Sequence, residues 1–110
     1  MPTVYVLQEN NHDYSPAEVF GEVRFITNDD VRSTVGCQQN ERVALDVRKF
    51  LDDYRAGEDY IVIAGNPVLV FMVAHALGRR NGGLETHNIL KWDGRQARYI
   101  QHSVKLLEVV

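Results

Sequence analysis

The sequence predicts an α/β fold: one domain over residues 1–110, with a mixed sheet of about five strands and two main helices. Two apolar runs of strand length, Thr3 to Leu7 and Tyr60 to Ala64, lack polar alternation, which is typical of inner strands covered on both faces. Segments with the properties of helices lie between strand-like runs. A chain of 110 residues has room for one core only. We therefore expect the order β-β-α-β-α-β-β.

The first half of the chain supplies two strands and one helix. After the first strand, the polar run Gln8 to Pro16 predicts a long loop, and loops of this length in small domains are often functional. The run Val19 to Thr27 predicts a second strand, interrupted or entered at Gly21. The segment Asn28 to Gln39 has no clear period, so we expect it to be irregular.

The helix that follows has a single apolar stripe. Asn40 is a suitable N-cap, and Gly57 is a suitable C-terminal stop. Apolar residues between them recur at helical spacing, namely Val43, Val47, Phe50, Leu51 and Tyr54. Charged residues occupy the other face, so that face is expected in solvent.

The second half predicts one parallel βαβ unit followed by an antiparallel hairpin. The strand at Tyr60 to Ala64 leads into a helix from Pro67 to about Arg80, which stops at Asn81-Gly82-Gly83. The next strand follows within about 30 residues of the first, the length of a βαβ unit. Strands at Thr86 to Trp92 and Tyr99 to Leu107 are then joined through Asp93-Gly94.

Composition excludes several classes of protein. The formal net charge is −3 and the pI about 5.7, which argues against binding to extended nucleic acid. One cysteine, Cys37, excludes an intrachain disulfide framework. The N-terminus does not resemble a secretory signal, and the longest apolar stretch is shorter than a membrane span. We expect a soluble cytoplasmic protein that does not bind membranes.

The predicted helix from Pro67 to about Arg80 is apolar on nearly every face. Packing against one face of a sheet cannot bury all of this apolar surface. Either the other helix covers the remaining surface, or the same helix of a second subunit does. We therefore expect a homodimer or a larger homo-oligomer.

The junction Gly65-Asn66-Pro67 allows two interpretations. Glycine lets the backbone turn sharply, and proline at the first helical position leaves the following amides free to face a ligand. Together with Val68, this junction is a candidate phosphate site at the helix N-terminus. Alternatively, Asn66 caps its own helix and binds nothing else. Neither GxGxxG nor GxxxxGK[ST] is present.

The hairpin KWDGRQARY is a second candidate site. Lys91, Arg95 and Arg98 lie close in sequence to Trp92 and Tyr99, so the hairpin combines positive charge with rings on which a base can stack. The alternative is a solvated hairpin in which the two aromatic rings pack across the strands.

No catalytic or metal signature is present. The four histidines are scattered singly and only one cysteine exists, so no metal site, resident cofactor or catalytic residue is expected. His75 on the apolar helix is more typical of a core or interface histidine. His12 and Asp13 in the long loop have no partner nucleophile, although His12 remains a candidate ligand contact.

Three stretches resemble a known group of proteins. The opening TVYVLQEN, the central DYIVIAGNP and the closing LKWDGRQARY are similar to small proteins encoded by bacteriophages and prophages, with Asn28 to Gln39 unmatched. The group has no assigned activity, so the resemblance implies a context, the cytoplasm of a host bacterium, rather than a chemistry.

The leading hypothesis is a non-enzymatic phage protein that captures a phosphate-bearing small molecule, such as a nucleotide signal of host defence. The candidate ligand-binding residues are Gly65, Asn66, Pro67, Val68, Lys91, Trp92, Arg95, Arg98 and His12. The alternative is a protein-binding inhibitor of a host enzyme that uses the loop Gln8 to Pro16 and the acidic residues Asp46, Asp52 and Asp53. An enzyme is the third possibility and rests on fold analogy alone.

Overall fold

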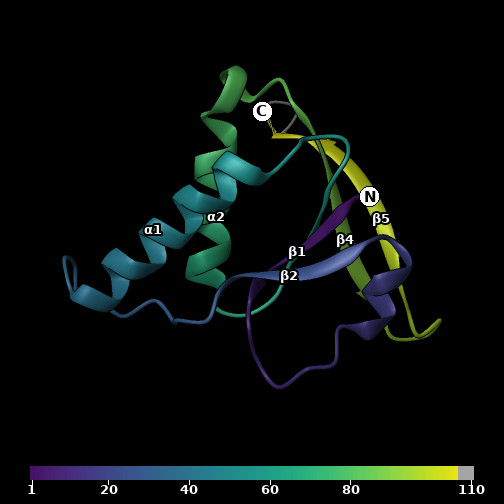
Figure 1. Ribbon diagram of the computed structural model, residues 1–110, viewed down its shortest axis with the longest axis horizontal. Coiled ribbons are helices and arrows are strands. Elements are labelled where there is room, and N and C mark those ends of the chain that lie inside the picture. Colours follow the sequence, from purple (N-terminus) through teal and green to yellow (C-terminus); the bar gives the residue numbers. More distant parts are fainter. Residues whose placement is uncertain (107–110) are drawn as a thin grey trace.

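A five-stranded sheet forms the centre of the molecule (Figure 1). The structure, a computed structural model, describes residues 1–106. The strands are β1 (Thr3–Gln8), β2 (Glu22–Thr27), β3 (Tyr60–Val62), β4 (Thr86–Asp93) and β5 (Arg98–Lys105). They lie in the order β2-β1-β3-β4-β5, and only β5 is antiparallel to its neighbour. The predicted mixed sheet and closing hairpin are confirmed, and the parallel part is larger than one βαβ unit.

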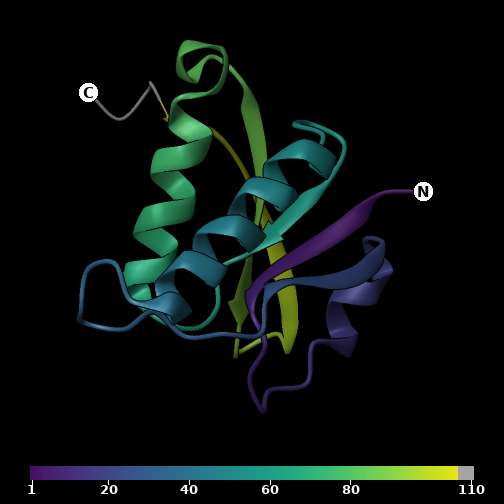
Figure 2. The ribbon, with the colours of Figure 1, turned by 60° about the vertical axis from the view of Figure 1, so that its left-hand side comes forward.

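Both α-helices cover one face of the sheet (Figure 2). They are α1 (Gln38–Asp53) and α2 (Pro67–Gly78), and each follows a strand of the parallel part. Their buried side chains form one core with Tyr5 and Leu7 of β1. The helices contribute Val43, Val47, Phe50, Leu69, Val73 and Leu77 to this core. The apolar stripe predicted for α1 is thus its buried face.

The opposite face of the sheet is covered by a short 3-10 helix, η1 (Ser15–Val19), and the residues around it. Ala17 of η1 and the preceding Tyr14 pack in a second core with Val4 and Val6 of β1. Strand β1 therefore buries alternate side chains on both faces, as its continuous apolar run predicted.

The predicted start of the second strand at Val19 was wrong, because Val19 ends η1. The predicted entry into this strand at Gly21 is confirmed, since β2 begins at Glu22. Between η1 and β2, Gly21 packs against the backbone of Pro2, where a Cβ would lie 2.8 Å from the carbonyl carbon of Pro2. Pairing of β2 with β1 therefore starts after this close approach, at Glu22 opposite Thr3.

Both predicted caps of α1 were also wrong. Asn40 lies inside the first turn, and the N-cap is Cys37. The Asn40 side chain instead holds the preceding loop, accepting from the Arg32 amide at 2.7 Å and donating to the Arg32 carbonyl at 3.0 Å. At the other end, Tyr54 is the C-cap, so Gly57, with φ +81°, belongs to the following turn.

Helix α2 ends at Gly78, slightly before the predicted end at about Arg80. The predicted stop is confirmed, since Asn81, Gly82 and Gly83 all have positive φ within the 3-10 turn η2 (Arg80–Gly83). The expected end of the last strand at Leu107 lies outside the described residues. Within residues 1–106, no helix has the length and apolar character needed to cross a membrane.

Candidate functional site

The sheet order places a crevice at the carboxyl ends of β1 and β3. From β1 the chain leads to β2 on one side, and from β3 it leads through α2 to β4 on the other side. In open α/β sheets, ligands bind where such connections diverge, outside the carboxyl ends of the strands. Gln8 ends β1, and Gly65 follows β3 at this point.

The backbone amides at the start of α2 are already occupied by side chains of the protein. The Asn66 amide donates to Oε1 of Gln8 at 2.8 Å, and the Val68 amide donates to Oδ1 of Asn66 at 2.9 Å. Pro67 between them has no N–H group. The prediction that these amides face a ligand was therefore wrong, and the alternative, in which Asn66 caps its own helix, is confirmed.

The protein also supplies its own negative charge at this helix end. Oδ1 of Asp30 accepts from Nδ2 of Asn66 at 3.0 Å and from Nε2 of Gln8 at 3.1 Å. These hydrogen bonds, first from Asn66 and then from Gln8, lower the pKa of Asp30 below its ordinary value. A carboxylate held near the N-terminus of α2 also matches the positive end of the helix dipole. A phosphate would have to displace it.

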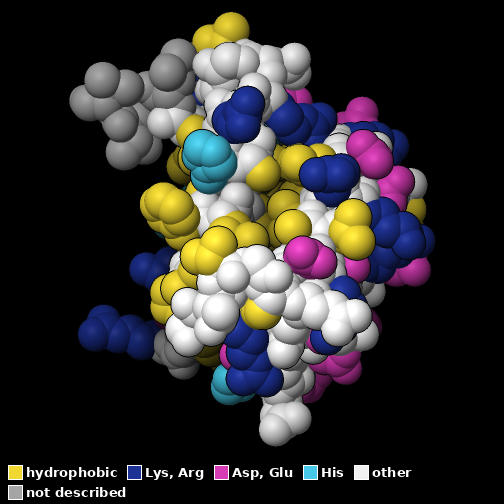
Figure 3. Space-filling view, turned by 90° about the vertical axis from the view of Figure 1, so that its left-hand side faces the viewer, with side chains coloured by type: hydrophobic (Ala, Val, Ile, Leu, Met, Phe, Trp, Pro, Cys, Tyr) yellow, Lys and Arg dark blue, Asp and Glu magenta, His cyan; other side chains and the backbone are white. Residues whose placement is uncertain are grey.

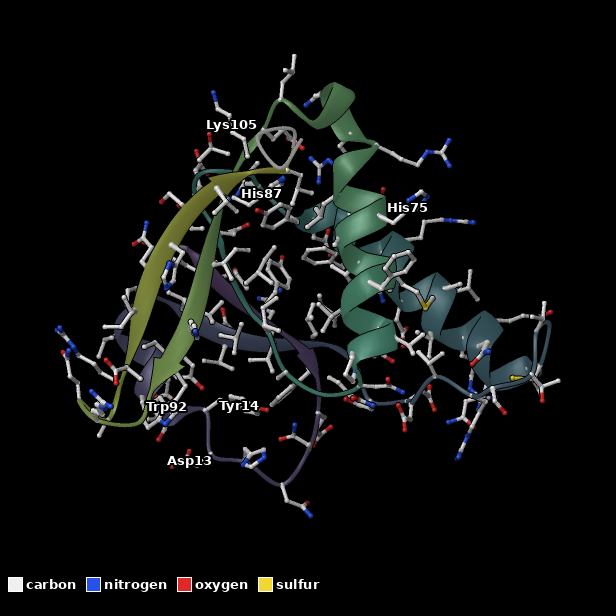
Figure 4. All side chains as sticks on the ribbon, turned by 180° about the vertical axis from the view of Figure 1, so that it is seen from behind. Asp13, Tyr14, His75, His87, Trp92 and Lys105 are labelled. Atoms are coloured by element: carbon white, nitrogen blue, oxygen red, sulfur yellow. The ribbon has the colours of Figure 1, made fainter. Side chains whose placement is uncertain are left out.

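A cavity of about 590 Å³ lies beside this junction, on the face of the sheet opposite the helices. The loop after β1, the end of β3 and the β4–β5 hairpin form its walls. Figure 4 shows Asp13, Tyr14 and Trp92 together at this end of the sheet. The lining residues are Asn10, His12, Asp13, Tyr14, Val62, Ile63, Ala64, Gly65, Trp92 and Tyr99.

Aromatic side chains form much of the cavity wall, and their positions are fixed. The rings of Trp92 and Tyr99 meet edge to face across the hairpin, with centroids 5.1 Å apart. Tyr14 is buried, and its hydroxyl donates to Oδ1 of Asn10 at 2.8 Å. Trp92 remains 46% exposed, so a ligand can reach its indole.

Asp13 gives the cavity a fixed negative charge. Its carboxylate accepts from the amide of Ser15 at 2.9 Å and from the hydroxyl of Ser15 at 3.0 Å. The bond from the Ser15 backbone, followed by the bond from its side chain, lowers the pKa of Asp13. Asp13 is therefore ionised at neutral pH and can accept further hydrogen bonds.

The residues predicted as a ligand site are only partly brought together. Gly65, His12 and Trp92 line the cavity. Lys91 and Arg95 line a separate depression of about 580 Å³ that shares Trp92 with it. Arg98 lies opposite Asp93 in the β4–β5 strand register, and Asn66, Pro67 and Val68 form the start of α2. The rings of Trp92 and Tyr99 pack against each other across the two strands, as the alternative interpretation of the hairpin predicted.

Sequence reasoning missed Asn10 and Tyr14 as cavity residues, whereas Tyr99 was considered as a stacking ring of the hairpin. The length of the polar loop after β1 indicated a functional loop. No local sequence pattern, however, places its Tyr14 against the hairpin. That contact depends on η1, which orients the loop over the sheet.

A buried polar pair lies on the helical face, away from the cavity. The hydroxyl of Tyr54 and Nδ1 of His87 are 2.7 Å apart, and their rings stack with centroids 5.6 Å apart. Burial raises the pKa of Tyr54 and lowers the pKa of His87, so both side chains stay neutral. In a neutral imidazole, Nδ1 accepts a hydrogen bond from the Tyr54 hydroxyl, so both of these atoms have a partner. The pair joins α1 to β4.

Comparison with known proteins identifies the family. A family model described as Phage Pam3 gp32-like protein matches residues 2–106. The chain belongs to this family of phage proteins, in agreement with the resemblance seen in its sequence. A search of curated proteins and a search of solved structures found no match.

Proposed function

We propose that this member of a phage protein family is a non-enzymatic binder that captures a nucleotide-like small molecule in the cavity beside Gly65. The ligand we envisage has a planar ring and a phosphate group. In an infected bacterium, such capture would remove a signalling nucleotide used in antiviral defence.

The observation that carries the proposal is the cavity itself. Its volume of about 590 Å³ lies within the range of roughly 300–1,000 Å³ typical of small-molecule sites. It sits where α/β sheets bind ligands, and it offers the exposed indole of Trp92 for stacking. The ionised carboxylate of Asp13 and the amide of Asn10 are suited to hydrogen bonds with the polar edge of a ring.

The phosphate is assigned to the mouth of the cavity rather than to the helix N-terminus. Asp30 already occupies that helix end. His12 is an exposed cavity residue, and Lys91 and Arg95 line the depression on the other side of Trp92. A ligand with its ring on the indole would direct its phosphate toward His12, or past the hairpin turn toward Arg95. Lys91, by contrast, alternates with Trp92 along β4 and lies on the helical side of the sheet.

Trp92 allows a direct test, because it is the only tryptophan of the chain. Indole fluorescence and isothermal titration would be followed with nucleoside monophosphates, cyclic mononucleotides, cyclic dinucleotides, free nucleosides and inorganic phosphate. We expect at least one nucleotide to quench the fluorescence and to release or absorb heat, with weaker binding of the matching nucleoside. Inorganic phosphate alone is expected not to bind. The absence of heat and quenching for the whole panel would overturn the proposal.

Two variants with matched controls test the assigned roles. Trp92→Ala should weaken binding roughly 5- to 150-fold, since stacking contributes about 1–3 kcal/mol per base. Leu84→Ala, an exposed apolar residue before the opposite end of β4, should leave affinity unchanged. Arg95→Gln should weaken nucleotide binding more than nucleoside binding, whereas Arg79→Gln after α2 should affect neither.

The alternative function, inhibition of a host enzyme through an acidic surface, receives less support. Oδ2 of Asp46 accepts from the hydroxyl of Thr27 at 2.8 Å, so this carboxylate helps to join α1 to β2. Only Asp52 and Asp53 of the proposed acidic set are exposed. A stoichiometric host protein that is lost on changing both residues to lysine, together with no nucleotide binding, would favour the alternative.

A further inference from the structure

Helix α2 presents an apolar surface to solvent. Phe71 is 74% exposed and Val68 is 52% exposed, while Ala74 on the same side is also exposed. No Lys, Arg, Asp or Glu occurs between Pro67 and Gly78. Figure 3 shows hydrophobic side chains gathered over this side of the molecule. Contiguous apolar surface without charge marks interaction sites in soluble proteins.

A groove beside α2 provides a matching concave shape. Its volume is about 170 Å³, and it lies between α2 and strands β4 and β5. Val70 and Ala74 line it from the helix, and Ile89 and Val104 line it from the strands. An apolar cavity of about 150 Å³ holds a benzene molecule, so this groove is large enough for a phenyl ring.

We propose that this surface is the interface of a homodimer in which Phe71 of each copy enters the groove of the other. The projecting ring and the groove occur on one face, because Phe71 and Ala74 are three positions apart on α2 and are therefore neighbours. A two-fold axis then brings the ring of each copy to the groove of its partner in the same step. Such self-complementarity is what a symmetric dimer requires.

The absence of charge favours a second copy over a charged partner. The chain has a formal net charge of −3, and an interface without charged side chains avoids bringing like charges into contact. The outer side of α2 has only His75 as a titratable group, and Figure 4 places His75 on this helix. Ile63, 48% exposed at the rim of the groove, extends the apolar contact.

Native mass spectrometry and sedimentation at micromolar concentration test the dimer. We expect the wild-type chain to be dimeric. Phe71→Ser removes the projecting ring, and Ala74→Phe fills the groove with a ring of its own chain. Each change should raise the dimer dissociation constant roughly 100-fold or more, because both symmetric contacts are lost together. Leu45→Ser, on the exposed side of α1, is the matched control and should remain dimeric.

Mixing the two variants distinguishes a ring-in-groove contact from nonspecific hydrophobic association. The Phe71→Ser chain keeps an open groove, and the Ala74→Phe chain keeps its projecting Phe71. A mixed dimer regains one of the two contacts, so it should form more readily than either variant with itself. A monomeric wild type, or a mixture with no preference for the mixed dimer, would overturn the inference. Both changes lie at exposed positions, and circular dichroism would verify that each variant is folded.

Discussion

Replacement of Gly65 by alanine tests whether the start of α2 is closed by the protein itself. Gly65 has a φ of +87°, a conformation that costs a residue with a Cβ about 1–2 kcal/mol. The added Cβ would also overlap Oε1 of Gln8 and lie 2.6 Å from its Cβ. Gln8 must then move and give up its bond to the Asn66 amide, which costs about 1–3 kcal/mol for a group left unsatisfied. The expected loss is about 2–5 kcal/mol.

Gly57 provides a matched control for the backbone strain. Its φ is +81°, and no atom lies within 4 Å of the position that a Cβ would take. Gly57→Ala should therefore lose only the cost of strain, about 1–2 kcal/mol. Urea unfolding followed by circular dichroism measures both free energies of unfolding. The difference between the two variants isolates the contact with Gln8.

A double-mutant cycle with Gln8→Gly, which also removes the Cβ of Gln8, checks the origin of that difference. Once the Gln8 side chain is absent, the Gly65→Ala change should cost no more than Gly57→Ala, so the two changes are non-additive by about 1–3 kcal/mol. If Gly65→Ala destabilises the wild type no more than Gly57→Ala, Gln8 does not close the junction. The amides of α2 would then be open to an external anion after all.

Three further predictions concern buried polar groups, each measured by urea unfolding. Tyr54→Phe should lose about 1–3 kcal/mol, because buried Nδ1 of His87 loses its partner. Burial lowers the pKa of His87 from its ordinary 6.5, so the unfolded chain binds more protons than the folded chain as the pH falls. The free energy of unfolding should therefore decrease from pH 7 to pH 5, by at most about 1.4 kcal/mol per pH unit. His87→Gln should flatten this dependence and exposed His102→Gln should not. Asp59→Ala should lose about 2–4 kcal/mol, because Asp59 is 1% exposed and accepts from two backbone amides and the Arg55 guanidinium.

Patterns repeated over several residues predicted most of the fold. The stripe of α1, the continuous apolar runs of β1 and β3, and the turn signal Asp93-Gly94 each depend on neighbours in sequence. Both Arg95 and Gln96 donate backbone N–H groups to Oδ1 of Asp93, which is the local bonding that such a turn signal indicates. Element order follows from such local signals.

Features that depend on distant residues were not predictable in the same way. Asn40 resembles a helix cap, yet its side chain is used by a loop eight residues earlier. The start of α2 resembles a phosphate site, yet Gln8, 58 residues away from Asn66, closes it. One sequence shows that an amide lacks a partner within its own helix, but not which side chain from another element reaches it.

The location of the two proposed surfaces follows from how the sheet is covered. Alternation along β3 sends Ile61 toward the helices and Val62 toward η1. The helical side therefore contains the groove of α2, and the other side contains the cavity next to Trp92. Asp30 occupies the helix end that lies between them, so the proposed ligand is assigned to the η1 side. Trp92 lies on that side, opposite the proposed dimer contact, and Ile63 lines both the cavity and the groove. Ligand binding and dimerisation are thus separable: loss of the dimer in Phe71→Ser should leave Trp92 quenching intact.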